Sequence, residues 1–445
     1  MVLSICKYRM TLTSIFNSNW KNNSDFLKEK NMTQIADSIQ IRNTTFKNRL
    51  IKGAMSEALA NDAGQPNQLH LGLYEAWAKG GLGCAITGNV MVDIRAKNEP
   101  GVVVAESERD LVELKKWADI GKQYEMVQLI QLSHPGRQCP KGLNKETVAP
   151  SAVPFSPMLA TMFGTPRELR EDEILDIIQR FAKAASICEK AGFEGVQLHG
   201  AHGYLISQFL SPLTNKRQDQ WGGSIENRMR FLLEIYKAVR EATSENFIIS
   251  VKLNSADFQR GGITEEDVIT VFKAIDAVGI DLIEISGGTY EAPAMAGAKS
   301  EKRKASTIAR EAYFLDFAEK IRQQVTCKLM VTGGFRTVAG MNAALQSGAC
   351  DFIGIARPFA VETDLANRLI AGQDVKYAVK PIKTGLPFVD KMAIMEIIWY
   401  AAQFRSIGKG KKPNPKLSPL LVFLNYAKGN IKAVIKGQVN SRKSA

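Results

Sequence analysis

Eight short apolar runs, each typical of a buried β-strand, recur along this chain with helix-like segments between them. The predicted strands are Leu50–Met55, Cys84–Met91, Met126–Leu132, Glu194–Leu198, Ile248–Leu253, Leu282–Ile285, Lys328–Val331 and Phe352–Ile355. Such alternation is typical of parallel βα units. Eight units close a barrel, whereas an open doubly wound sheet usually stops at five or six strands. The pattern therefore predicts an α/β fold of the (β/α)8 type, a TIM barrel.

Amphipathic segments between these runs predict the helices Glu171–Ala191, Ser224–Ala242, Glu265–Val278 and Phe314–Val325. Ser224 and Thr264 stand where an N-cap is needed, with acidic residues in the first turn that follows. The segment Arg42–Lys47 is predicted to form a short hairpin across the N-terminal mouth of the barrel.

The chain divides into three predicted parts. Residues 1–34 are polar and irregular, and we expect them to be disordered or an over-called start. Residues 35–375 form the barrel, and residues 376–445 form a helical extension with a basic tail, in which Met392–Phe404 is apolar enough to dock as a helix. Lys428, Lys432 and Lys436 predict a basic amphipathic helix. It suits weak contact with a membrane surface, although packing on the barrel or against a second subunit of a homo-oligomer is favoured.

The formal net charge of +13 does not indicate a nucleic-acid partner, because much of it lies in one segment. Residues 406–445 carry nine Lys and Arg and no Asp or Glu. No apolar run approaches the roughly 18–20 residues of a membrane span. The six cysteines are scattered without a C-x-x-C pair, which argues against a zinc or iron–sulfur site and favours reduced thiols in the cytoplasm.

Two of the four histidines, His199 and His202, follow the fourth predicted strand, and Tyr204 comes two residues later. Ligands bind at this end of the strands in parallel α/β folds. Two imidazoles and a phenol suit carbonyl polarisation and proton delivery. A metal pair is disfavoured because no third ligand recurs at a neighbouring strand end. Structural histidines and a merely packed tyrosine remain the alternatives.

The ends of the last two predicted strands favour a phosphate site. Gly333 and Gly334 allow backbone N–H groups to approach an anion, and small Ala356 followed by Arg357 offers space and a bidentate cation. Other strand ends present Ser56, Gly88, Gln131 and Lys252. This set of donors and acceptors suits a planar cofactor such as flavin mononucleotide (FMN), and no Rossmann fingerprint is visible.

Several segments of the chain resemble motifs of the old yellow enzyme family of flavin-dependent ene-reductases. The resemblance covers roughly residues 38–375, and the motifs follow in the same order. The matching segments are Asn48-Arg49-Leu50 leading to Ala54-Met55-Ser56, Gln131–Arg137, His199–Leu205, Gln208–Pro212, Trp221–Arg228, Thr332-Gly333-Gly334 and Arg357-Pro358-Phe359. The combination is specific, because an unrelated fold should not reproduce every one of these segments.

The resemblance implies noncovalent FMN, reduction by NAD(P)H in a ping-pong cycle, and hydride transfer to an electron-poor alkene. His199 and His202 match the pair that binds a carbonyl or nitro oxygen, and Tyr204 matches the proton donor. The implied FMN contacts are Ala54, Met55, Ser56, Gly88, Gln131, Lys252, Gly333, Gly334, Ala356 and Arg357.

Three positions depart from the family pattern or vary within it. Lys252 stands where arginine is usual near flavin N1 and O2, so the positive charge is kept without the planar fork. Ser56 stands beside flavin O4 and N5, where relatives carry threonine or cysteine. Ala58 replaces a substrate-contacting tyrosine of one branch, which puts the substrate range of that branch in doubt.

Other polar residues are interpreted structurally. We expect His134 to shape a loop, His70 to face solvent, and Ser224–Arg228 to form a helix cap with an ion-pair network. Two other functions stay open at this point. One is an NAD(P)H oxidase with oxygen as acceptor, and the other is a barrel that binds a phosphorylated ligand without redox turnover.

Overall fold

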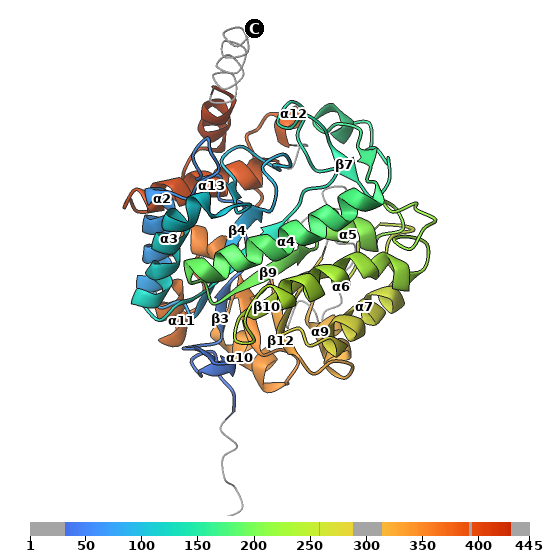
Figure 1. Ribbon diagram of the computed structural model, residues 1–445. Coiled ribbons are helices and arrows are strands. Elements are labelled where there is room, and N and C mark those ends of the chain that lie inside the picture. Colours follow the sequence, from blue (N-terminus) through green and yellow to red (C-terminus); the bar gives the residue numbers. More distant parts are fainter. Residues whose placement is uncertain (1–31, 258, 288–313, 391–393, 429–445) are drawn as a thin grey trace, which may run out of the picture.

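The computed structural model describes residues 32–257, 259–287, 314–390 and 394–428 (Figure 1). Its central sheet contains eight parallel strands that close into a barrel: β3 (Leu50–Lys52), β4 (Cys84–Met91), β6 (Val127–Ser133), β9 (Gly195–Gly200), β10 (Ile248–Asn254), β11 (Leu282–Ser286), β12 (Lys328–Thr332) and β13 (Phe352–Ile355). Closure comes from β3, which pairs with β13 on one side and with β4 on the other. The predicted (β/α)8 barrel is confirmed.

Helices surround the strands in the order that the sequence pattern predicts (Figure 1). They are α2 (Gln68–Lys79), α3 (Leu111–Gln123), α4 (Glu171–Ala191), α5 (Leu205–Leu210), α6 (Ile225–Glu241), α7 (Glu265–Ala277), α9 (Leu315–Arg322), α10 (Val338–Gln346) and α11 (Leu365–Ile370). The side chains of Ser224 and Thr264 cap α6 and α7 by accepting backbone N–H groups, as predicted. The last predicted helix is shorter than expected, because α9 ends at Arg322.

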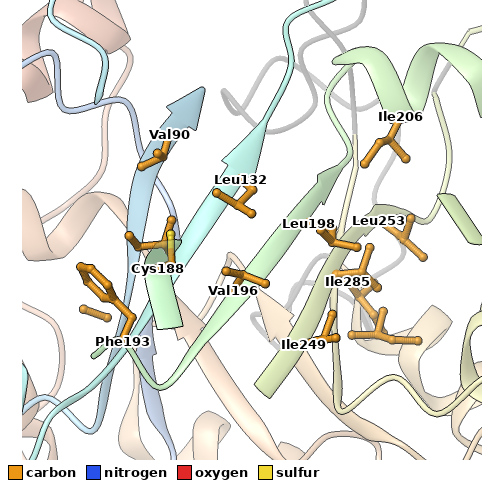
Figure 2. Packing of buried hydrophobic residues seen from close by; sticks show 14 of the residues in the cluster. Val90, Leu132, Cys188, Phe193, Val196, Leu198, Ile206, Ile249, Leu253 and Ile285 are labelled. Carbon is orange, nitrogen blue, oxygen red and sulfur yellow. The ribbon is translucent and has the colours of Figure 1, made fainter. Parts of the chain in front are cut away.

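Strand alternation sorts side chains between two environments. Successive residues on a strand point to opposite faces, so Val196 and Leu198 on β9 pack in the layer between strands and helices (Figure 2). The intervening Gln197 is fully buried and hydrogen-bonds to inward-facing residues of β6 and β11. The same alternation turns Gln131, Lys252 and Glu284 into the barrel. Polar residues on these strands therefore gather at its centre.

The N-terminal mouth of the barrel is plugged by apolar side chains. An antiparallel hairpin, β1 (Ile39–Ile41) with β2 (Thr44–Phe46), lies across it. The ring of Phe46 packs on that of Phe352 with centroids 5.0 Å apart. The predicted hairpin is confirmed, although it begins three residues earlier than Arg42. With this end sealed, ligand access is left to the opposite end.

Strand ends differ from prediction in ways that matter for the site. The first strand stops at Lys52 rather than Met55, so residues 54–56 lie in the loop that follows. Strand β9 runs on to Gly200, so His199 is held within the strand and not after it. Strand β12 likewise includes Thr332.

Helix α13 (Ile394–Gly408) belongs to the C-terminal extension and docks on α2, which confirms the docked helix expected at Met392–Phe404. Gly72 and Gly408 allow this approach, since a Cβ on Gly72 would lie 2.5 Å from the Gly408 carbonyl oxygen. Residues 1–31 and 429–445, with most of the expected basic helix, lie outside the described residues. Within the described parts, no helix is long and apolar enough to cross a membrane.

Short elements occupy further parts of the described residues. They are β5 (Val103–Val104), β7 (Val148–Ala149), β8 (Arg167–Glu168), α12 (Pro387–Asp390) and the 3-10 turns Glu108–Asp110, Leu159–Thr161 and Arg357–Ala360.

Candidate active site

A cavity that is partly open to solvent lies at the carboxyl end of the strands. Its lining includes all the predicted site residues except Gly88, namely Ala54, Met55, Ser56, Gln131, His199, His202, Tyr204, Lys252, Gly333, Gly334, Ala356 and Arg357. Side chains from distant parts of the sequence therefore meet at one surface. The lining also contains Asn89, Ser286, Arg336, Glu396 and Tyr400, which the sequence analysis did not select.

Gly88 lies behind this lining. Its N–H donates to the Glu57 carboxylate across 3.0 Å. A Cβ at Gly88 would lie 2.7 Å from the carbonyl oxygen of Met55. The absence of a side chain at Gly88 thus lets the loop at residues 54–56 pack closely on β4, and contact of Gly88 with a cofactor stays a prediction.

His199 projects from β9 into the cavity as a neutral donor. Its Nδ1 accepts the N–H of Ala201 at 3.4 Å, which leaves the proton on Nε2. Burial lowers its pKa well below the usual value, and the nearby Lys252 charge lowers the pKa further. At neutral pH the imidazole is therefore uncharged.

His202 lies beside His199, with ring centroids 5.3 Å apart and planes 88° apart. Its backbone has a φ of 59°, and its N–H donates to Asn254 Oδ1 at 3.3 Å. The Nε2 atom lies 2.8 Å from the hydroxyl of Ser286. Burial, with Lys252 and then His199 as further causes, lowers the pKa of His202 well below its usual value. Two neutral imidazoles can thus offer N–H groups without a charge of their own.

Tyr204 places its phenol against the ring of His199, with centroids 4.5 Å apart. Its oxygen accepts hydrogen bonds from the amide of Asn89 at 3.0 Å and from the amide of Asn98 at 3.3 Å. The phenol is only 4 % exposed. Two donors on one phenol oxygen fix its orientation and stabilise the phenolate that proton donation would leave behind.

Ser56 has a carboxyl partner that the sequence analysis missed. Glu99 is hydrogen-bonded to the Ser56 side chain, and burial raises the pKa of Glu99 to about 7. Ser56, where the resemblance implies flavin O4 and N5, is thus joined to a group from the loop after β4 that titrates near neutral pH.

A buried polar network forms the floor of the cavity. Gln131 donates to Gln197 at 2.7 Å, and Gln197 donates to Glu284 at 2.9 Å. Lys252 lies 2.9 Å from the same carboxylate, to which Thr332 donates at 2.7 Å. The period-2 alternation of the strands was the signal that could have revealed Gln197 and Glu284.

The floor fits the pyrimidine edge of FMN. The Oε1 atom of Gln131 is buried and has no hydrogen-bond partner within the described parts of the chain. Such an atom costs free energy unless a ligand donor satisfies it. The flavin N3–H is such a donor, and flavin O2 and N1 are acceptors suited to the Lys252 ammonium. Gln131 and Lys252 can therefore hold this edge.

The opposite end fits a phosphate. Gly333 and Gly334 have φ values of 100° and 97°, which only glycine adopts readily, and both line the cavity, although the Gly333 N–H already donates to the Gly354 carbonyl across 3.3 Å. Arg336 and Arg357 line the same end and provide positive charge. The small side chain of Ala356 leaves space at this end of the cavity. The residues present thus match both ends of FMN.

Helix α13 contributes a wall near this phosphate end. Glu396 lies 3.7 Å from the Arg357 guanidinium, and burial raises the pKa of Glu396. Tyr400, one turn later, also lines the cavity. A segment of the C-terminal extension therefore completes the site, and no local sequence signal indicated this contact.

His70 corrects one prediction. It is 1 % exposed rather than solvent-facing. Its Nδ1 accepts the N–H of Asn67 at 3.2 Å, which completes a capping box at the start of α2. Its ring packs on Trp117 with centroids 4.9 Å apart, and burial lowers its pKa to about 4. The polar residues at 61–68, which precede His70, concealed a buried helix start.

The other structural interpretations are confirmed. His134 Nδ1 accepts the N–H of Gly136 at 3.2 Å, which shapes the loop after β6. Ser224 caps α6, and Arg228 pairs with Asp267 at 2.6 Å. Arg228 is buried, so this ion pair lies deeper than expected. Among the described residues no cluster of three His, Cys, Asp or Glu side chains could hold a metal ion.

Residues 35–375 match the model of the NADH:flavin oxidoreductase / NADH oxidase family. The NADH-dependent flavin oxidoreductase iliE of Hypocrea jecorina is 39% identical over 351 residues, which covers 75% of this chain and 87% of that protein. The NADH-dependent flavin oxidoreductase iccE of Talaromyces variabilis is 35% identical over 406 residues, with coverage of 84% and 98%.

Solved structures share the fold. A 2-naphthoyl-CoA reductase in complex with 2-naphthoyl-CoA superposes with a TM-score of 0.71 at 26% identity, covering 83% of this chain and 58% of that one. The old yellow enzyme homologue from Zymomonas mobilis superposes with a TM-score of 0.66 at 24% identity, covering 80% and 96%. The latter likeness concerns the fold alone.

Proposed function

We propose that this chain, which belongs to the NADH:flavin oxidoreductase / NADH oxidase family, reduces the C=C bond of α,β-unsaturated carbonyl or nitro compounds. It is an FMN-dependent NAD(P)H oxidoreductase of the old yellow enzyme type. The observation that carries the proposal is the arrangement of His199, His202 and Tyr204. Two neutral imidazoles and a phenol line one cavity, with ring centroids 5.3 Å and 4.5 Å apart.

Each double bond reduced takes up one hydride and one proton. FMN held by Gln131, Lys252 and the phosphate end of the cavity would supply the hydride chemistry that couples NAD(P)H oxidation to reduction of the alkene β-carbon. The chain's own residues have the remaining tasks. His199 and His202 donate N–H groups to the carbonyl or nitro oxygen and polarise the double bond. A donor aimed at developing negative charge contributes on the order of 10²–10³ in rate.

Tyr204 supplies the proton to the α-carbon. Its phenol is held by Asn89 and Asn98, which donate to its oxygen and leave its proton directed elsewhere. These two amides also stabilise the oxygen as it loses that proton. Because burial keeps the pKa of both histidines well below the usual value, they offer N–H donors to the substrate oxygen without adding positive charge.

A direct assay tests the proposal. Purified protein is incubated without oxygen with NADH or NADPH and 2-cyclohexenone. We expect one cyclohexanone for each nicotinamide oxidised. Protein that consumes NAD(P)H only when air is admitted, and forms no cyclohexanone, would contradict the proposal and favour the second candidate.

That second candidate is an NAD(P)H oxidase with oxygen as the main acceptor. The description of the matching family, which includes NADH oxidases, is the observation in its favour. The buried donor pair is against it, because oxygen needs no carbonyl-binding donors. The third interpretation, a barrel without redox turnover, is contradicted by membership of a flavin oxidoreductase family. The cytoplasmic location, the homo-oligomer and the membrane contact of the tail stay predictions.

A further inference from the structure

We propose that Glu284, a buried carboxylate that takes no part in the hydride or proton steps, is a positioning residue that sets the reduction potential of the bound flavin. The inference rests on the FMN site described above, and it does not depend on which acceptor the enzyme uses. Glu284 is 0 % exposed and lies in the middle of β11.

Three donors from three different strands converge on this carboxylate. Its Oε1 atom lies 2.9 Å from the ammonium of Lys252 on β10, and it accepts from the hydroxyl of Thr332 on β12 at 2.7 Å. Its Oε2 atom accepts from the amide of Gln197 on β9 at 2.9 Å. A buried carboxylate with three donors is held in one orientation.

Two chains of side-chain contacts connect Glu284 to the cavity. One is Lys252, whose ammonium lines the floor. The other is Gln197, which accepts from Gln131 at 2.7 Å and so fixes the amide whose Oε1 has no partner in the described structure. One carboxylate therefore aligns both the cation and the acceptor that match the pyrimidine edge.

The charge of Glu284 has a separate effect. A flavin gains negative charge at N1 and O2 on reduction, and a nearby ammonium stabilises that charge. Charges in a protein interior interact more strongly than in water. The carboxylate at 2.9 Å offsets part of the Lys252 field. Glu284 therefore holds the flavin potential lower than Lys252 alone would set it.

The test is the midpoint potential of Glu284→Gln holoenzyme, measured without oxygen against reference dyes. We expect a more positive potential, with the ratio of reduced to oxidised flavin at a given potential rising at least tenfold, which is about 30 mV for a two-electron couple. Sulfite, which adds to oxidised flavin and leaves negative charge at N1, should bind the variant more tightly. An unchanged or lower potential would overturn the inference.

A matched control lies three residues upstream. Asp281 precedes β11 at the opposite end of the barrel, where it binds Arg42 at 2.6 Å and the N–H of Ile249 at 2.8 Å. The substitution Asp281→Asn makes the same change of charge away from the cavity. It should leave the potential at the wild-type value, and a shift as large as that of Glu284→Gln would contradict the local effect.

Glu284→Asp separates charge from shape. It keeps the carboxylate but shortens its reach to Gln197, so FMN should bind more weakly while the potential stays near that of wild type. If the aspartate variant shifts the potential as much as the glutamine variant does, disruption rather than charge is responsible and the inference fails.

Glu284→Gln leaves Lys252 without its carboxylate and can fail to fold. In that event Thr332→Val tests the same charge by the opposite change. It removes the hydroxyl that donates to Glu284, so the negative charge of the carboxylate is less screened. We expect a lower potential in Thr332→Val and a wild-type value in Thr332→Ser. A potential that rises or stays constant in the valine variant would overturn the inference. Failure to reduce alkenes would overturn the proposed function alone, because the potential is measured without any alkene.

Discussion

The side-chain amide of Asn89 donates a hydrogen bond across 3.0 Å to the phenol oxygen of Tyr204. Asn89 lies on β4 and Tyr204 at the start of α5, so barrel closure brings the two together. The hydrogen bond from this amide becomes stronger as the phenol oxygen acquires negative charge. We therefore expect Asn89 to assist proton donation by Tyr204 without contacting the substrate carbon.

Replacing Asn89 with leucine should slow alkene reduction by about tenfold, since a hydrogen bond to a charged oxygen contributes roughly 1.5 kcal/mol or more. Flavin reduction by NAD(P)H should be unaffected. Stopped-flow measurement of the two half-reactions checks this. If both slow equally, Asn89 supports the cavity as a whole and has no particular role toward Tyr204.

Tyr204→Phe removes the proton donor and should slow the alkene half-reaction by about 10²-fold or more. The nicotinamide half-reaction needs no phenol and should keep its rate. The ring is retained, so the packing against His199 is preserved. Equal loss in both half-reactions would refute the assignment of the phenol as proton donor.

Exchanging His199 or His202 for alanine should weaken the binding of phenols, which present an oxygen to the same donors, by about tenfold for each lost hydrogen bond. The spectrum of the bound flavin reports this binding. Because the pKa of each histidine lies well below its usual value, neither histidine should cause a loss of phenol binding between about pH 6.5 and pH 8. Phenols that perturb the flavin equally in wild type and both variants would show that they bind elsewhere.

Stability should fall in mild acid because of buried histidines. The pKa values of His70 and His134 are about 4 in the folded protein, whereas the unfolded chain binds the proton near 6.5. The unfolded state therefore takes up more protons as the pH falls from about 6.5 toward 4. Each site then costs roughly 3 kcal/mol when the effect is complete. Above about pH 6.5 both histidines are neutral in the folded and the unfolded state, so this loss of stability is absent.

Urea denaturation at pH 7 and pH 5 measures this dependence. Replacing His70 with glutamine, which can still accept the Asn67 N–H, should reduce the loss of stability on acidification. A variant with the same pH dependence as wild type would mean that His70 does not stay neutral in the folded state.

Regular patterns made the barrel and most of the cavity predictable. Strand alternation and cap residues are local, and the carboxyl ends of parallel strands must meet, so His199, Gln131 and Lys252 could be grouped before the structure was known. The same rule, applied to inward positions, would also have found Glu284. Contacts that depend on irregular loops or on segments far apart in the sequence could not be predicted.

Asn98 and Glu396 illustrate that limit. Asn98 reaches Tyr204 from an irregular loop. Glu396 reaches Arg357 only because α13 folds back on α2, which depends on the close approach of Gly72 and Gly408. His70 was misjudged because a polar stretch precedes it, while its own ring completes a helix cap and packs on Trp117. Such contacts are set by packing across long sequence separations.

Reoxidation of the NAD(P)H-reduced protein tests the central claim most directly. Reduced enzyme is mixed in a stopped-flow instrument with 2-cyclohexenone without oxygen, or with air-saturated buffer, and the return of the yellow flavin absorbance is followed. We predict faster reoxidation by 2-cyclohexenone than by air, with cyclohexanone as product. Reoxidation by air alone, with no response to 2-cyclohexenone or to a nitroalkene, would contradict the assignment of His199, His202 and Tyr204 to alkene reduction.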